Sequence, residues 1–258
     1  MLTKDTYQHI TEEHNLHAAS EIVPFLVKIL GPQSVLDVGC GIGTWLWEFK
    51  QAGVKTVKGI DNPYVDKKLL TQYLQEQEFL AYDLSKPFDF NEKFDLVISL
   101  EVAEHLPASS AEIFVDSLTK HSDIILFSAA VPFQDGQNHI NEQWPEYWYS
   151  FFEKKGYVPY DFVRDKFWHN SNVDIWYRQN ILLYAKPNLP KLQSFSPATG
   201  RLSRVHPELF ELRMKKLKKA RLLIEEHIAK PTVKHSFKIL VKSLVQTLKP
   251  RFDSAKKS

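Results

Sequence analysis

Short apolar runs and amphipathic stretches alternate along the first half of the chain. The apolar runs predict strands at 34–38, 54–60, 78–82, 94–100 and 123–131. Between them, apolar side chains at helical spacing or a helical composition predict helices at 18–30, 44–52, 65–77 and 109–120. Strict alternation of strand and helix is typical of a parallel sheet with helices on both faces. Such sheets bind their ligands at the carboxyl ends of the strands.

The pattern changes after residue 131. Polar loops occupy 132–145 and 164–175, with a helix at 146–155 and strands at 157–163 and 176–186 around them. A loop of 14 residues inside a compact domain is usually functional, so we expect chemistry in 132–145. The predicted fold class is therefore α/β, a doubly wound and mostly parallel sheet of seven strands.

A glycine-rich turn follows the first strand. Gly39, Gly41 and Gly43 tolerate positive φ and lack a Cβ atom, so a ligand can lie against bare backbone at the start of the next helix. Asp37 precedes them within the strand, and Asp61 ends the next strand, where a carboxylate can accept both hydroxyls of a ribose. Dinucleotide sites use a different order of glycines with no leading acid. Asp37 therefore favours a positively charged ligand that carries an amino-acid group.

These residues resemble the first motif of the class I S-adenosylmethionine-dependent methyltransferases. The resemblance implies S-adenosylmethionine as cofactor, and a seventh strand antiparallel to the rest. It also implies that Asp83 hydrogen-bonds the adenine amino group, with Leu84 against the ring. Residues 101–106, Glu-Val-Ala-Glu-His-Leu, are similar to an element that follows the fourth strand in many of these enzymes. This element places Glu101 beside the cofactor, and His105 is then a cofactor-side or scaffold residue more than a base.

Methyl transfer to a hydroxyl requires removal of a proton, and the loop 132–145 offers a histidine for this step. His139 is the predicted general base because imidazole titrates near neutral pH, and Glu142 would orient it or bind substrate. His105 completes the predicted catalytic set. The alternative is that His139 and Glu142 only hold the loop to the sheet. A metal site of His139, Glu142, His105 and His169 lacks tight ligand spacing, so no metal is predicted.

Aromatic and amide side chains in the two loops and the last strand suggest a sugar. Trp168 and Trp144 could stack on sugar rings, and Asn141 and Arg178 could bind hydroxyls. Segments 34–46, 139–148 and 176–183 together resemble bacterial class I methyltransferases associated with surface-polysaccharide biosynthesis. This resemblance implies O-methylation of a glycan or glycan precursor. The alternatives are a methyltransferase for a small metabolite or lipid headgroup, or a non-catalytic protein that recruits partners through its tail.

Charge divides the chain in two. From residue 201 onward, 16 lysines and arginines stand against 5 acidic residues, a net of +11, whereas the first 200 residues hold 17 against 26, a net of −9. We expect a methyltransferase domain at 1–186, a linker at 187–206 and a basic amphipathic tail at 207–258. An acidic core argues against nucleic acid as substrate. The tail suits an anionic membrane surface, docking on the domain, or self-association.

One cysteine and the lack of a long apolar run favour a cytoplasmic protein, with peripheral contact at the inner face of the membrane as an option for the tail.

Overall fold

The computed structural model describes residues 16–225, 233 and 236–243. The chain forms two units, of which the first ends at Leu209 and the second begins at Phe210. The part of the predicted tail beyond residue 243 lies outside the described residues. The carboxyl edge of the sheet and its loops belong to the first unit.

A seven-stranded sheet in the order β3-β2-β1-β4-β5-β7-β6 forms the centre of the first unit. Only β7 runs antiparallel to its neighbours, β5 and β6. The predicted α/β fold and its antiparallel last strand are therefore confirmed. The strands are β1 Ser34–Val38, β2 Thr56–Asp61, β3 Phe79–Ala81, β4 Leu96–Leu100, β5 Ile124–Ser128, β6 Val158–Tyr160 and β7 Leu182–Ala185.

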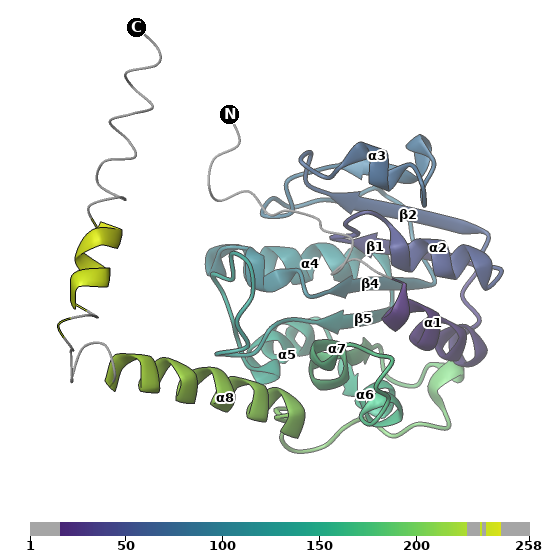
Figure 1. Cartoon of the computed structure of the whole chain (residues 1–258). Helices are drawn as coiled ribbons and strands as arrows, with labels where there is room; N and C mark the ends of the chain where they lie inside the picture. Colours follow the sequence, from purple (N-terminus) through teal and green to yellow (C-terminus); the bar gives the residue numbers. More distant parts are fainter. Residues whose placement is uncertain (1–15, 226–232, 234–235, 244–258) are drawn as a thin grey trace, which may run out of the picture. The chain divides into compact units, whose positions relative to one another are not determined.

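Helices cover both faces of the sheet (Figure 1). Strand residues alternate between two apolar clusters, as Val35 and Leu36 do, because successive side chains of a strand point to opposite faces. One cluster contains side chains of α1 His17–Leu30, α2 Thr44–Gln51, α3 Lys67–Leu70, α6 Phe162–Phe167 and α7 Ile175–Asn180. The other contains those of α4 Ala111–His121 and α5 Pro145–Lys154. Short 3₁₀ segments are η1 Glu76–Glu78, η2 Ala103–His105, η3 Ala108–Ser110 and η4 Pro190–Leu192.

Several predicted elements differ from the structure. The expected strand 157–163 pairs only over β6, Val158–Tyr160, and α6, Phe162–Phe167, covers its end and the start of the expected loop 164–175. The expected helix 65–77 contains only the four residues of α3, which the Asp66 side chain caps by accepting from the amides of Lys68 and Leu69. The expected strand 176–186 begins as helix α7, and only Leu182–Ala185 pair in the sheet. The helical turn buries Arg178, Gln179 and Asn180, whose polar side chains all find distant partners.

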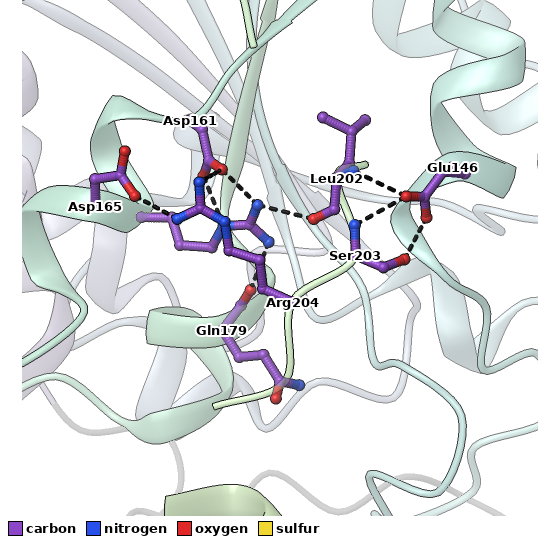
Figure 2. A network of polar contacts seen from close by, with 8 residues as sticks. Glu146, Asp161, Asp165, Gln179, Leu202, Ser203 and Arg204 are labelled. Atoms are coloured by element: carbon purple, nitrogen blue, oxygen red, sulfur yellow. Dashed lines mark hydrogen bonds and ion pairs between the residues drawn. The ribbon is translucent and has the colours of Figure 1, made fainter. Parts of the chain in front are cut away.

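The segment predicted as a linker packs on the sheet domain. The Glu146 carboxylate accepts from the amides of Leu202 and Ser203 at 2.8 and 2.9 Å. The fully buried Arg164 donates to the carbonyl of Leu202 at 2.8 Å. Arg204 pairs with Asp161 at 2.8 Å and also contacts Asp165 (Figure 2). The first unit therefore extends well past the last strand.

Helix α8 spans Pro207–Ile224. Along it, lysines at 215, 216, 218 and 219 lie between exposed apolar side chains such as Leu217. Within the described residues, no helix has both the length and the apolar character that a membrane span requires.

Candidate active site

Parallel strands bring four loop segments to one edge of the sheet. β1, β2, β4 and β5 end there, which places the loop 39–43, Asp61, Glu101 and the segment 129–144 at this edge. Because β7 is antiparallel, its first residue lies at the same edge, so α7 adds Arg178, Gln179 and Asn180. The topology thus gathers most of the predicted site residues.

The glycine loop is held to the end of β2. Gly39 N donates to the Ile60 carbonyl at 2.8 Å, and Gly41 N donates to Asp61 Oδ2 at 2.7 Å. All three glycines have positive φ, between 52° and 89°. A Cβ on Gly39 would lie 2.3 Å from Val102 Cγ2, and one on Gly43 would lie 2.6 Å from Leu74 Cγ. These two glycines therefore also make room for the protein's own side chains, a role that the sequence did not indicate.

Two acidic side chains at this loop create a negative field. Asp37 and Asp61 are buried, with 3% and 7% exposure. Burial, and then the Asp61 charge, raise the pKa of Asp37 well above its ordinary value of 3.8. Burial and the same two carboxylates also raise the pKa of the Cys40 thiol. Adjacent buried carboxylates are costly without a counterion, so this loop fits a ligand with an ammonium and a sulfonium charge, as S-adenosylmethionine has.

The residues predicted for the adenine lie at the end of β3. Asp83 is exposed, and its Oδ1 accepts from the amide and hydroxyl of Ser85 at 3.0 and 2.6 Å. The hydroxyl contact lowers the pKa of Asp83, which is therefore ionised at neutral pH. Leu84 is buried in the apolar cluster shared with α4 and α5. Asp83 remains the prediction for the adenine contact, whereas Leu84 mainly serves the core.

Glu101 lies at the centre of a polar network just after β4. Its backbone φ is +55°, a conformation that costs a non-glycine residue about 1–3 kcal/mol and is frequent at functional sites. Its carboxylate accepts from Gln134 Nε2 at 2.7 Å and from Asn180 Nδ2 at 3.1 Å. Asn180 also donates to Gln134 Oε1 at 2.7 Å. Burial raises the pKa of Glu101 in spite of these hydrogen bonds.

The predicted catalytic residues lie together beside this network. His139 Nδ1 is 2.9 Å from Glu142 Oε1, and the rings of His139 and His105 meet edge to face with centroids 4.9 Å apart. Glu142 also accepts from the amides of Phe133 and Asp135, which fixes the loop around His139. Both interpretations of this pair therefore have a structural basis, since Glu142 orients the imidazole and also holds the loop.

The four residues predicted to bind substrate differ in whether they already have partners within the protein. Trp144 is 40% exposed, and Asn141 is buried with an amide nitrogen that has no acceptor within the described chain. Arg178 forms a two-pronged ion pair with Glu208 at 3.1 and 2.8 Å. Trp168 packs on His206, with ring centroids 4.5 Å apart. Arg178 and Trp168 thus have protein partners, while Trp144 and Asn141 remain the stronger predictions for substrate.

Three residues outside the predicted catalytic and binding sets also lie at the site. Glu104, Gln134 and Asn180 join Glu101 and His139 at this edge. Glu104 belongs to the Glu-Val-Ala-Glu-His-Leu element, so the sequence contained a signal for it. Asn180 lies 79 residues from Glu101, and only the sheet topology brings the two together.

A separate surface hollow lies at the opposite edge of the sheet. It is lined by residues that precede β4 and β5 and by 189–191, and contains none of the predicted site residues. Strands of a parallel sheet bind ligands at their carboxyl ends, so the hollow is not the candidate site.

Solved structures with the same fold include two methyltransferases. The magnesium protoporphyrin IX methyltransferase of Synechocystis PCC 6803, solved with S-adenosylhomocysteine (SAH), matches with a TM-score of 0.51 and 20% identity, over 70% of this chain and 90% of that one. A sugar N-methyltransferase of Streptoalloteichus sp. ATCC 53650 matches with a TM-score of 0.54 and 14% identity, over 72% and 96%. At these identities the likeness concerns the fold.

Sequence comparison gives one curated relative and one family. The chain is 31% identical over 121 residues to the tRNA U34 carboxymethyltransferase of Pseudomonas fluorescens (strain SBW25), an alignment of 43% of this chain and 37% of that protein. The chain thus matches little more than a third of the relative's length. Residues 7–164 match the model of a methyltransferase domain. Because this match spans more than half of the sequence, the chain belongs to that methyltransferase family, with S-adenosylmethionine as its cofactor.

Proposed function

We propose that the chain transfers the methyl group of S-adenosylmethionine to a hydroxyl group, on a sugar of a glycan or glycan precursor. The observation that carries this proposal is the His139–Glu142 pair at the strand edge that also bears the glycine loop. A hydroxyl must lose its proton as it attacks a methyl group, and a positioned base contributes about 10²–10⁴-fold to such a step.

The protein's own residues have distinct parts in this reaction. Asp61 and the loop amides would hold the ribose side of the cofactor, and Asp37 would pair with its ammonium group. The cofactor supplies an electrophilic methyl group on sulfur. When Nδ1–H of His139 donates to Glu142, the other ring nitrogen keeps its lone pair and can take the proton of the acceptor. Holding the acceptor in line is worth about 7–11 kcal/mol in well-oriented systems.

The preference for a sugar rests on the side chains near this pair. Trp144 offers a partly exposed aromatic face, and the buried amide nitrogen of Asn141 has no hydrogen-bond acceptor within the described residues. Aromatic faces beside buried amides suit a ring that carries several hydroxyls.

A transfer assay tests the proposal. Full-length protein is incubated with methyl-labelled S-adenosylmethionine and separate sets of nucleotide sugars, lipid-linked glycans, small phenols and tRNA. We expect label in a sugar set and in an ether linkage that resists alkali. Label only in phenols or in tRNA would overturn the sugar assignment, and label on nitrogen would overturn O-methylation.

A variant links the assay to the site. His139→Ala should lower kcat at least a hundredfold, while the affinity for SAH in calorimetry changes less than threefold. Full activity of this variant would remove His139 from the reaction.

A further inference from the structure

The function proposed above leaves one enclosed acid unexplained. The Glu104 side chain has 0% exposure, and neither carboxylate oxygen has a hydrogen-bond partner of good geometry within the described residues. Only the backbone amides of Glu104 and Ala130 favour its ionised form among the groups found to act on it in the described chain. A buried carboxylate without a strong partner destabilises the folded protein. A cation that binds there would offset this cost.

Two histidines lie beside this carboxylate. One ligand atom each from Glu104, His105 and His139 lies within 4.8 Å of the other two. Ligands of one metal ion, each about 2.0–2.2 Å from it, lie at most about 4.4 Å apart, so small side-chain shifts suffice. The backbone already joins the two segments, because the amides of Ile140 and Asn141 donate to the Glu104 carbonyl at 2.9 and 3.0 Å.

The negative charges around Glu104 also favour binding of a cation. The Glu101 and Glu142 carboxylates lie close enough to act electrostatically on the fully buried Glu104. No lysine or arginine in the described part of the chain forms an ion pair with any of these three acids. Within the described residues, three carboxylates and two imidazoles therefore lie close together without an ion pair to a lysine or arginine.

His139 makes the same kind of hydrogen bond that metal-binding histidines usually make. Such residues usually donate their second ring N–H to a carboxylate, which fixes the ring and its tautomer. Glu142 accepts from His139 Nδ1 at 2.9 Å in this way. Gly136 makes room for the ring, since a Cβ there would lie 2.2 Å from His139 Nε2. An alanine at 136 would therefore displace the imidazole without removing it.

We propose that Glu104, His105 and His139 bind one divalent ion of a first-row transition metal. Two imidazoles disfavour Mg²⁺ and Ca²⁺, which prefer oxygen ligands, and Cys40 lies in the glycine loop, outside the group. Three protein ligands leave coordination positions open. If the hydroxyl transfer proposed above is correct, the acceptor oxygen would take one of them, and the bound ion would lower the pKa of that hydroxyl so that its proton passes to solvent water. The role of metal ligand would replace the role of base that the proposed function gives to His139.

Metal binding is measured on full-length protein without substrate. The protein is treated with EDTA, desalted and titrated with Mn²⁺ or Zn²⁺ by calorimetry, while the loss of the free Mn²⁺ signal is followed by electron paramagnetic resonance. We expect one ion per chain at micromolar concentrations, and at least tenfold weaker binding of Mg²⁺. Absence of binding of both Mn²⁺ and Zn²⁺ at about 100 µM, far above a micromolar Kd, would overturn the proposal.

Variants assign the ligands. Glu104→Gln and His139→Asn should each weaken Mn²⁺ binding at least a hundredfold, and Glu142→Gln about 10–100-fold as an outer partner. Gly136→Ala should also weaken it, because the ring must move. His169→Asn is the matched control, since His169 is exposed and lies outside the group, and its affinity should equal that of the wild type. Equal losses in His169→Asn and His139→Asn would contradict the assignment.

Thermal denaturation separates a metal ligand from a structural acid. In EDTA, Glu104→Gln should melt at a higher temperature than the wild type, because it removes a buried charge without a partner. With Mn²⁺ the wild type should gain stability and the variant should not. A lower melting temperature of Glu104→Gln in EDTA would show that the carboxylate supports the fold by itself. These readouts need no acceptor, so a failed sugar assay would leave the metal result standing, and the reverse also holds.

Discussion

The Asp61 carboxylate accepts a hydrogen bond from the Gly41 amide at 2.7 Å, which joins the tip of β2 to the glycine loop after β1. This contact sets the position of the acid that we assign to the ribose. It also means that a change at Asp61 alters the shape of the loop as well as its charge.

Asp61→Asn should weaken binding of SAH at least tenfold in calorimetry. The variant loses a charged acceptor at the position assigned to ribose, and a hydrogen bond to a charged group contributes about 1.5–3 kcal/mol. Asp83→Asn should show a smaller loss, because Asp83 is exposed at the end of the edge strand β3. Equal affinities for the wild type and Asp61→Asn would remove Asp61 from the cofactor site.

Asp37 should make the stability of the ligand-free protein depend on pH. Its pKa is raised in the folded state, so the folded protein binds its proton more readily than the unfolded chain. The free energy of unfolding therefore falls as pH rises from about 4 through the raised pKa. Asp37→Asn has no carboxyl group to ionise, so above this pH range its free energy of unfolding should exceed that of the wild type by about 1–2 kcal/mol. This is the cost of one buried polar group without a hydrogen-bond partner.

Urea unfolding at pH 4 and pH 8 measures this difference. The stability advantage of Asp37→Asn should be larger at pH 8 and should shrink when S-adenosylmethionine is added, because the cofactor ammonium then offsets the wild-type charge. A difference that is the same at both pH values would contradict the assigned cause.

Gly39→Ala should destabilise the fold by about 2–4 kcal/mol, because the new methyl would overlap Val102 and the residue would be held at φ +85°. Gly53→Ala is the matched control. It has φ +93°, but no atom lies within 4 Å of the place that its Cβ would take, so it carries the backbone strain alone. Urea unfolding of both variants separates overlap from strain. Equal losses would show that Val102 moves aside freely.

A chain cut after residue 209 should fold, and a chain cut after 186 should not. The shorter chain loses Leu202, Arg204 and His206, and leaves the buried Arg164 without the Leu202 carbonyl. Soluble yield and circular dichroism of the two fragments measure this. A cooperative transition in the shorter fragment would show that residues 187–209 only lie on the surface.

Much of the fold was predictable because it depends on local signals. Apolar runs, helical spacing and the glycine turn all act within a few residues, and they placed the sheet correctly. The start of the last strand was not predictable in this way. Residues 176–180 form α7 because Arg178, Gln179 and Asn180 reach Glu208, His206 and Glu101, which lie 30, 27 and 79 residues away.

Parts of the candidate site were also predictable from the sequence. His139, Glu142 and His105 were expected at the strand edge, and the structure places them together. The burial of Glu104 without a good partner depends on how η2 packs under the loop 129–144, and no local pattern of residues encodes that. Trp168 and Arg178 found partners in the segment 206–208, which the sequence presented as the end of a linker.

The position of β7 between β5 and β6 has a consequence for synthesis on the ribosome. Until residues 182–185 emerge, the apolar strand β5 has an unpaired edge and β6 has no neighbour to join. Asn180, which steadies Glu101, emerges only two residues before this closing strand. The polar network around Glu101 is therefore completed during synthesis at nearly the same time as the sheet, when the last strand leaves the ribosome.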